Sequence, residues 1–332
     1  MKAVLCVLAL IALVAFASAD RLGYYTELVN EVNSKQNLWK AELNTELLDG
    51  DYTTIRNLLG DLSAGSVSDL EPKTSGWTVK VEDLPKNFIV QDKWGRQCAG
   101  VMNTVHDQSA CGSCWAVSTA AAAAERLCVK TGVDNMFLSS RDLLSCCSSC
   151  GFGCQGGYPS AAWSYIANTG LVTGSPWSTN STLCVRYPFL TCKHHTEGEP
   201  QCSDYDFDTP SCQKSCDKES TWPVSYQDDK IKFSRSYSLS SEADVMRDLY
   251  ENGPMTFSYT VYEDFLQYRS GVYKHTSGKR LGGHATVLVG WGEENGVQYY
   301  IVKNNWNSAW GEQGYFRIVR GDSSPSFTAG LP

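Results

Sequence analysis

Short runs of β-branched and aromatic residues fill the C-terminal third of the chain. They are TFSYTVY, HATVLVGWG, VQYYIVKNNW and GYFRIVRG, and each has the length and composition of a β-strand. The stretch SEADVMRDLYENGP before them has helical spacing instead, with Ser241 as a plausible N-cap and Gly253-Pro254 as its end. We therefore expect one helix followed by antiparallel strands.

The middle of the chain is helical in pattern. An alanine-rich helix is expected to begin at Cys114, and a second one in YPSAAWSYIANTG is expected to end near Gly170. A helical half followed by a β half predicts an α+β protein with a cleft between two lobes.

The region from Asp20 to about Leu84 has no cysteine and reads as a separately attached segment. Leu28, Val32 and Trp39 fall on one helical face, and a second short helix is expected to end at Gly60. The loop GDLSAGSVSDLEPKTSG that follows has the composition of an exposed connector. A segment packed only on its own core is the alternative reading.

The first 19 residues have the pattern of a secretory signal peptide. Lys2 precedes an apolar run, and Ala17-Ser18-Ala19 fits a small-residue cleavage site. The run is shorter than the roughly 18 residues of a spanning helix, which makes a membrane anchor the minor alternative. We expect entry into the secretory pathway and no membrane span.

Composition narrows the partners and the chemistry. The chain has 332 residues and a net charge of −8, which argues against nucleic acid as a partner. In an oxidising compartment its 14 cysteines favour disulfides over zinc ligands. Cys6 belongs to the leader, and an odd number remains, which leaves one thiol available for chemistry.

Cys114 is the candidate for that thiol. It stands where a helix begins, and the positive end of the helix dipole stabilises a thiolate. The chain has five histidines, and His284 in GGHATVLVGWG has the context of an oriented base on a buried strand. The others have simpler readings: an approach loop for His106, the surface for His275, and a metal or anion site for His194 and His195.

Four motifs, CGSCWA, GGHA, KNNW and WGEQGYF, resemble the active-site motifs of papain-family cysteine proteases, in the same order from Leu84 onward. The resemblance implies a papain-like two-lobe fold. It assigns Cys114 as nucleophile, His284 as general base, Asn304 as the residue that orients the base, and Gln108 as an oxyanion donor. Trp306 would shield the contact between the base and Asn304.

An insertion points to the cathepsin B group within that family. Cys114 and His284 are farther apart than the roughly 130–150 residues of the papain pattern. The surplus includes CKHHTEGEPQC, which resembles the occluding loop, here about residues 192–212. His194 and His195 would hold a substrate's C-terminal carboxylate, which suits dipeptide removal, and Gly156 and Gly157 would contact the substrate backbone.

The same resemblance pairs the cysteines and leaves Cys114 over. The implied disulfides are Cys98–Cys128, Cys111–Cys154, Cys146–Cys212, Cys147–Cys150, Cys184–Cys216 and Cys192–Cys202.

Two departures from the cathepsin B pattern bear on specificity. The loop offers Glu199 and Pro200 where an arginine latch is usual, and Ala309 replaces its aspartate partner, which predicts a loosely held loop and strong endopeptidase activity. The tail RGDSSPSFTAGLP lacks the glutamate often found in the second substrate pocket, so we expect apolar residues to be preferred there.

The resemblance divides the chain into a signal peptide (1–19), an inhibitory propeptide (20–83) and a peptidase domain (84–332). Its helical lobe would be mainly 84–225 and its β lobe mainly 226–332. Acid is expected to weaken the propeptide's carboxylate contacts and permit cleavage near Leu84-Pro85. Asn180 is a glycosylation sequon.

The expected partners are peptide and protein substrates, the chain's own propeptide and cystatin-like inhibitors. We expect a monomer without cofactor or metal, in a lysosome-like acidic compartment or secreted. A catalytically silent binding protein and a metal-binding module are the alternatives.

Overall fold

The computed structural model of the chain describes residues 21–45, 52–66, 68–176, 178, 182–192 and 199–332. The signal peptide, Asn180, His194 and His195 therefore lie outside the described residues. In the part that is described, no helix is long and apolar enough to cross a membrane.

A helix over residues 21–35 opens the described chain. The named α-helices are α3 (Tyr52–Asn57), α4 (Val90–Trp94), α5 (Ala99–Asn103), α6 (Cys114–Thr131), α7 (Ser140–Cys146), α8 (Pro159–Asn168) and α9 (Glu242–Asn252). The short 3-10 helices are η1 (Val81–Asp83), η2 (Gly153–Gln155), η3 (Cys202–Asp204) and η4 (Glu263–Gln267).

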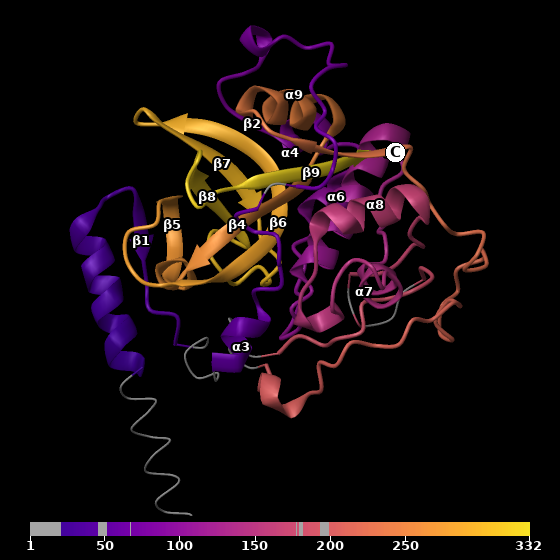
Figure 1. The fold of residues 1–332 in the computed structure, drawn as a ribbon, viewed down its shortest axis with the longest axis horizontal. Helices are drawn as coiled ribbons and strands as arrows, with labels where there is room; N and C mark the ends of the chain where they lie inside the picture. The colour runs from indigo at the N-terminus through magenta and orange to yellow at the C-terminus, as the bar shows by residue number, and fades with distance from the viewer. Residues whose placement is uncertain (1–20, 46–51, 67, 177, 179–181, 193–198) are drawn as a thin grey trace, which may run out of the picture.

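The strands are β1 (Trp39–Ala41), β2 (Phe88–Ile89), β3 (Arg235–Leu239), β4 (Met255–Tyr262), β5 (Tyr268–Tyr273), β6 (Arg280–Glu294), β7 (Val297–Lys303), β8 (Tyr315–Val319) and β9 (Ser326–Leu331). They pair in the order β1-β5-β8-β7-β6-β4-β9-β3, with β2 added to β6. The pairs are antiparallel except β5 with β8. The sheet curls into a barrel-like lobe beside the helical lobe (Figure 1).

The predicted α+β fold with two lobes is confirmed. The alanine-rich helix is α6, and Ser241 caps α9 by accepting a hydrogen bond from the Asp244 amide. The four predicted strands correspond to β4, β6, β7 and β8. The sequence analysis missed β3, β5 and β9, whose glycine and hydroxyl residues weaken the strand pattern.

The expectation for Trp39 is wrong. The first helix ends at residue 35, and Trp39 begins β1, where it pairs with Gly271 of β5. The side-chain oxygen of Gln36 accepts hydrogen bonds from the Leu38 and Trp39 amides, which turns the chain out of the helix. The open edge of β5 then offers strand pairing to a residue that helical spacing had placed elsewhere.

Helix α6 lies between the lobes and is buried along most of its length. Every residue from Cys114 to Cys128 is buried, and the run Ala120–Ala124 lets strands and helices approach closely from both sides. It contacts β4 and β6 on one side and α7 and α8 on the other. The helix is thus the common core of the two lobes.

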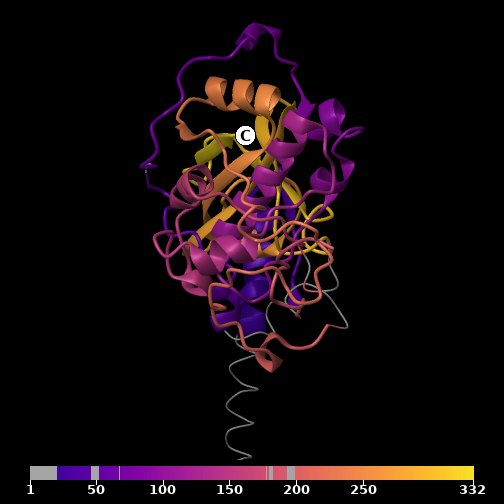
Figure 2. The ribbon, with the colours of Figure 1, turned by 90° about the vertical axis from the view of Figure 1, so that its right-hand side faces the viewer.

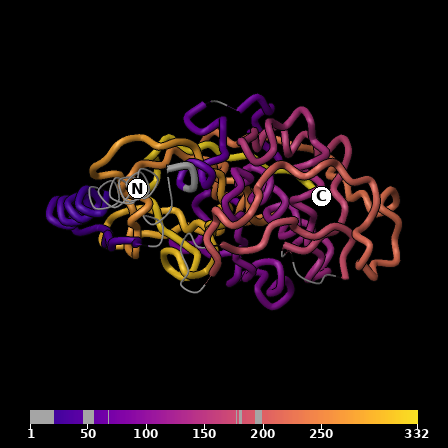
Figure 3. Tube along the Cα trace, turned by 90° about the horizontal axis from the view of Figure 1, so that it is seen from below, coloured from indigo at the N-terminus to yellow at the C-terminus, as the bar shows by residue number. Residues whose placement is uncertain are grey.

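All six disulfides implied by the resemblance are present, and Cys114 is the free cysteine among the described residues. Cys98–Cys128 joins the start of α5 to α6, and the other five bridges hold the loops around α7, η2 and η3. Seen from below, these loops and the first helix occupy opposite ends of the long axis (Figure 3).

The described residues of the N-terminal segment (21–45, 52–66 and 68–83) run over the surface of both lobes. Its first helix lies against the β lobe, where Tyr24 donates to Glu263 and Glu31 accepts from Ser277. Its last part arches over α9 and ends in η1, which both side views show (Figures 1 and 2). Between these ends the segment crosses between the lobes.

Candidate active site

Cys114 is the first residue of α6, as its place in the pattern predicts. Its thiol is fully buried, and the Gly60 amide of the N-terminal segment donates to Sγ over 3.2 Å. The Trp115 amide, at the N-terminal end of the same helix, also hydrogen-bonds toward the sulfur. The sulfur therefore lies where backbone N–H groups and the helix dipole favour negative charge.

His284 lies on β6, opposite Tyr259 of β4. Its Nε2 is 2.8 Å from Oδ1 of Asn304, while the side-chain Nδ2 of Asn305 instead donates to the Ala285 carbonyl. An amide oxygen can only accept, so Nε2 carries the proton in this contact. The structure thus brings Asn304, and not its neighbour, to the histidine.

Trp306 covers this contact. Its ring stacks on His284 with centroids 4.5 Å apart and an interplanar angle of 28°, and both side chains are buried. The hydrogen bond between His284 and Asn304 is therefore screened from water, which strengthens it and fixes the ring.

Gln108 is held in place by the segment after β7 that carries Asn305. Its backbone amide donates to the Asn305 carbonyl over 2.9 Å, and its side-chain Nε2 donates to Cys111 over 2.7 Å. The same Nε2 faces the Leu58 carbonyl at 3.4 Å and the Asn57 carbonyl at 3.3 Å. A side-chain donor is thus directed at carbonyl oxygens that pass over the thiol.

Residues 57–62, here called the crossing, occupy the cleft between the lobes. Gly157 donates to the Gly60 carbonyl over 2.9 Å and accepts from the Leu62 amide over 3.0 Å, and the two segments run parallel. A Cβ on Gly60 would lie 1.9 Å from the Gly112 carbonyl oxygen, so only glycine allows this close approach. Gly156, also expected at the substrate, faces the same crossing.

Burial under this crossing sets the charge state of the pair. It raises the pKa of Cys114 to about 12, with the Asp61 carboxylate adding to the effect. It lowers the pKa of His284 to about 3, although Asn304 opposes the shift. The expected low thiol pKa is therefore not found here, because the covered site holds a neutral thiol and a neutral imidazole.

The remaining described histidines lie outside the cleft. His106 is buried, and burial followed by the charge of Lys303 lowers its pKa to about 3. His275 is half-buried rather than a plain surface residue, with Nδ1 3.2 Å from Asp264 and its ring stacked on Tyr262. No group of metal-ligating side chains is found among the described residues.

A small pocket of about 110 Å³ lies beside the crossing, under Leu62 and Tyr158. The sequence analysis missed the hydroxyl groups that line it, from Ser258 on β4 and from Ser326 and Thr328 on β9. The signal for them in the sequence is an alternation of hydroxyl residues, at Thr256, Ser258 and Thr260 on β4 and at Ser326 and Thr328 on β9. Among the described residues from 84 onward, no carboxylate lines the pocket.

Comparison with known proteins places this geometry in context. The profile of the family described as papain family cysteine protease matches residues 84–328. Cathepsin B-like cysteine proteinase 4 of Caenorhabditis elegans is 39% identical over 319 residues, covering 94% of this chain and 93% of that protein. Cathepsin B-like cysteine proteinase 5 of the same organism is 38% identical over 352 residues, covering 98% and 97%.

Among solved structures, procathepsin B S9 from Trypanosoma congolense matches with a TM-score of 0.75 and 34% identity. The match covers 93% of this chain and 97% of that one. The similar structure is a proform, so the likeness extends over the N-terminal segment as well as the two lobes.

The covered thiol should react slowly with iodoacetamide in the full-length chain. A thiol of pKa about 12 is ionised to only about one part in 10⁵ at pH 7. Gly60→Ala should speed alkylation by about tenfold or more, since the added Cβ displaces the crossing. Mass spectrometry of the Cys114 peptide measures the rate.

Gly23→Ala is the matched control, because a Cβ at Gly23 meets open space. Equal alkylation rates in both variants and the wild type would show that the crossing does not protect the thiol.

Proposed function

The chain belongs to the papain family of cysteine proteases. We propose that it is made as a precursor, which residues 20–83 keep inactive, and that the form without this segment hydrolyses peptides through Cys114. The observation that carries this proposal lies where the two lobes meet. The thiol at the start of α6 is hydrogen-bonded by the Ala285 amide, and the preceding residue is the histidine held by Asn304. We propose endopeptidase activity together with removal of C-terminal dipeptides.

The residues can take the following roles. The Cys114 thiol gives its proton to His284 and attacks the scissile carbonyl carbon, forming a C–S bond and an oxyanion. His284 then protonates the leaving amine as the C–N bond breaks, and water hydrolyses the thioester by the same route. Gln108 Nε2 and the Cys114 amide would donate to the oxyanion.

The N-terminal segment blocks this chemistry by position. Its backbone lies over Cys114 and uses the donors of Gln108 and Gly157, which a substrate needs. It runs parallel to Gly157. We propose that activation requires removal of this crossing and cleavage near Leu84-Pro85.

Acid acts on the crossing through His284. The pKa of this histidine is about 3 when covered, against an ordinary value near 6.5, so covering favours the neutral ring. The resulting stabilisation is full above pH 6.5 and is lost as the pH falls from 6.5 toward 3. Protonation of His284 therefore favours the open cleft.

The buried Asp61 has the opposite sign. Burial raises its pKa, and Ser258 and Ser63 only partly offset the effect, so covering becomes more favourable as this carboxyl protonates. The expectation that acid weakens the segment's carboxylate contacts is thus wrong for Asp61. The histidine, not this carboxylate, gives acid its opening effect.

Amide exchange in an inactive Cys114→Ser chain can separate these two groups. From pH 6.5 to 5, protonation of His284 should lower protection of the Asp61 and Leu62 amides by about fifteenfold, after correction for intrinsic rates. With Asp61→Asn added, the two amides should lose protection by this full factor. Without it they should lose less, because Asp61 opposes His284. Asp69→Asn is the control and should match the unmodified segment. Protection that rises in acid in Asp61→Asn would contradict the assignment to His284.

We propose that His194 and His195 bind a substrate's C-terminal carboxylate. Their loop is anchored by the Cys192–Cys202 disulfide, which packs against Ala110, four residues before the nucleophile. Imidazolium groups give charge-assisted hydrogen bonds to a carboxylate, and they charge in acid. Because Ala309 replaces the aspartate that usually pairs with an arginine of this loop, we propose that the loop also opens for internal cleavage.

A peptide with a free C-terminus and its amidated twin test both activities. The acid-matured protease should cleave both, and should release a dipeptide from the free peptide faster by about tenfold or more. His194→Ala with His195→Ala should remove that preference and leave cleavage of the amidated twin unchanged. Cys114→Ala is the inactive control, and a double variant that keeps the preference would exclude the histidines as the clamp.

The pocket under Leu62 supports our proposal that arginine is not favoured at the second substrate position. A residue there would meet hydroxyl groups and the Tyr158 ring rather than a carboxylate. Ser326→Glu should therefore raise kcat/KM for an arginine substrate by about tenfold, through a new ion pair. Ser326→Gln is the uncharged control, and a leucine substrate should gain nothing. Wild-type cleavage of arginine as fast as leucine would refute the proposal.

We further propose a monomer that works in an acidic lysosome-like compartment or outside the cell, is inhibited by cystatin-like proteins, and carries a glycan at Asn180. The secretory leader pattern and the requirement for a charged clamp support this setting.

A further inference from the structure

The last part of the propeptide, residues 70–79, is docked on the peptidase domain apart from the cleft. It runs along β3, the edge strand of the sheet. The Ser238 amide donates to the Glu71 carbonyl over 3.1 Å, and the Lys73 amide donates back to the Ser238 carbonyl over 2.9 Å. The Ser238 hydroxyl also donates to the Leu70 carbonyl over 2.8 Å. The segment thus adds a short parallel strand to an open edge.

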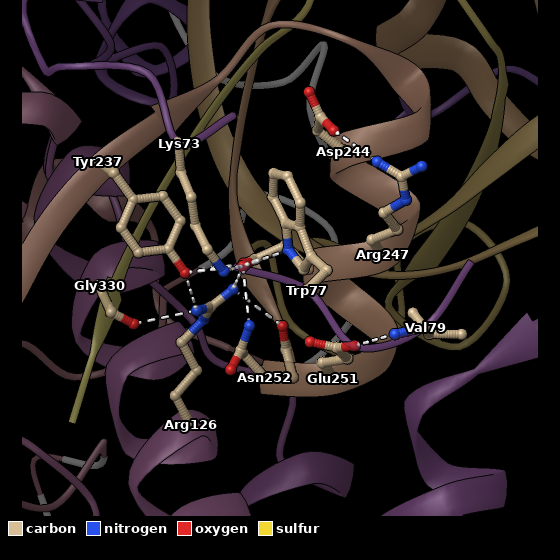
Figure 4. A network of polar contacts seen from close by, with 12 residues as sticks. Lys73, Trp77, Val79, Arg126, Tyr237, Asp244, Arg247, Glu251, Asn252 and Gly330 are labelled. Atoms are coloured by element: carbon tan, nitrogen blue, oxygen red, sulfur yellow. Dashed lines mark hydrogen bonds and ion pairs between the residues drawn. The ribbon is translucent and has the colours of Figure 1, made fainter. Parts of the chain in front are cut away.

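Lys73 enters the protein from this added strand. Its ammonium group is 2.7 Å from Oδ1 of Asp248, and the two side chains are only 6% and 0% exposed. Figure 4 shows the Lys73 side chain between Tyr237 and Trp77. The rings of Trp77 and Tyr237 lie 4.6 and 5.1 Å from the ammonium group, which adds cation–π attraction on two sides. A lysine is almost never buried this fully without such partners.

Asp248 binds two cations, Arg126 and Lys73, in a buried position. Arg126 of α6 already contacts its Oδ2 over 2.5 Å, and the Tyr237 hydroxyl and the Asn252 amide donate to the same carboxylate. Burial alone would raise the pKa of Asp248, but Arg126 and Lys73 outweigh it and lower the pKa. Removal of one partner from a buried charged cluster is strongly unfavourable, so Lys73 stabilises the buried Asp248 carboxylate.

The backbone after Lys73 is held by a second carboxylate. Oε1 of Glu251 accepts from the Thr78 and Val79 amides, each over 2.6 Å, and from the Thr78 hydroxyl over 2.8 Å (Figure 4). Trp77 lies between Lys73 and Thr78 in the chain, and the Arg247 guanidinium is 5.7 Å from its ring. Asp248 and Glu251 both belong to α9, so one helix binds both the lysine and the backbone that follows it.

We propose that the edge of β3 together with Asp248 and Glu251 is a docking site for a lysine-bearing extended segment. Its occupant is the chain's own residues 70–79, which can rebind in trans after they have been cut off. Because the site is separate from the cleft, the released segment binds without blocking hydrolysis. This inference rests on the proposed cleavage of the propeptide, since only cleavage opens the site.

The separation from the cleft follows from helix geometry. Arg126 and Cys114 are twelve residues apart on α6, which is about 18 Å along the axis. Residues 57–62 contact Cys114, Gln108, Gly157 and Gly283, whereas Lys73 and Trp77 contact Asp248 of α9. In Figure 1, α3 and α9 lie at opposite sides of the molecule.

A labelled synthetic peptide of residues 68–82 tests the site. It is titrated into acid-matured protease whose hydrolysis of a peptide substrate has first been measured, and whose Cys114 has then been alkylated. We expect saturable binding that is equal before and after alkylation. Lys73→Ala in the peptide should weaken binding by about tenfold or more, while Lys80→Ala, which alters a lysine outside the site, should not.

The protease side has a matched pair on α9. Glu251→Ala should weaken binding of the wild-type peptide, and Glu242→Ala, on an exposed position of the same helix, should leave it unchanged. Absent binding, loss of binding on alkylation, or equal affinity of the Lys73→Ala peptide would each overturn the inference. Hydrolysis without binding would leave the proposed function intact, and binding without hydrolysis would refute the function alone.

Amide exchange in the full-length Cys114→Ser chain is a second test that needs no maturation. Lys73→Ala should deprotect the amides of Thr78 and Val79 and leave those of Asp61 and Leu62 protected. Joint loss of protection in both regions would mean a single contact surface and would overturn the independence of the site.

Discussion

The burial of α6 on all sides is the constraint on which the rest of the structure depends. A helix packed between two lobes has no face on which a charge can reach water, yet Glu125 and Arg126 stand side by side on it. Each must therefore be paired by a different element. Glu125 contacts Lys303 of β7 over 2.7 Å, and Arg126 contacts Asp248 of α9.

Both functional regions follow from this helix. Its N-terminal end places Cys114 at the junction of the lobes, where His284 arrives from β6 and the donors of Gln108 and Gly157 surround the passing backbone. Toward its C-terminal end, Arg126 fixes Asp248 in a buried position that a second cation can share. The N-terminal segment thus meets α6 at both ends, at Cys114 through its backbone and at Arg126 through the pair of Lys73 with Asp248.

Local chemistry made part of this predictable. The start of α6, the six disulfides and the positions of His284 and Asn304 all follow from motifs whose residues are close in sequence or fixed by family resemblance. The place of Trp39 on β1 was not predicted, because helical spacing cannot reveal the free edge of β5. The charge state of Cys114 escaped because it depends on what covers the thiol, and a helix N-terminus predicts only the uncovered case.

Lys73 had no signal at all, because its partner lies 175 positions further along the chain. The pairing also explains why acid need not act on the whole propeptide at once. His284 loses its stabilising effect on the crossing as the pH falls below its ordinary pKa, whereas the pKa of Asp248 is lowered by its two cations. The Asp248 contact is therefore complete above the ordinary aspartate range and is lost only below the lowered pKa. In mild acid the cleft contact weakens first while the lysine contact persists, so one continuous segment responds to pH in two separate steps.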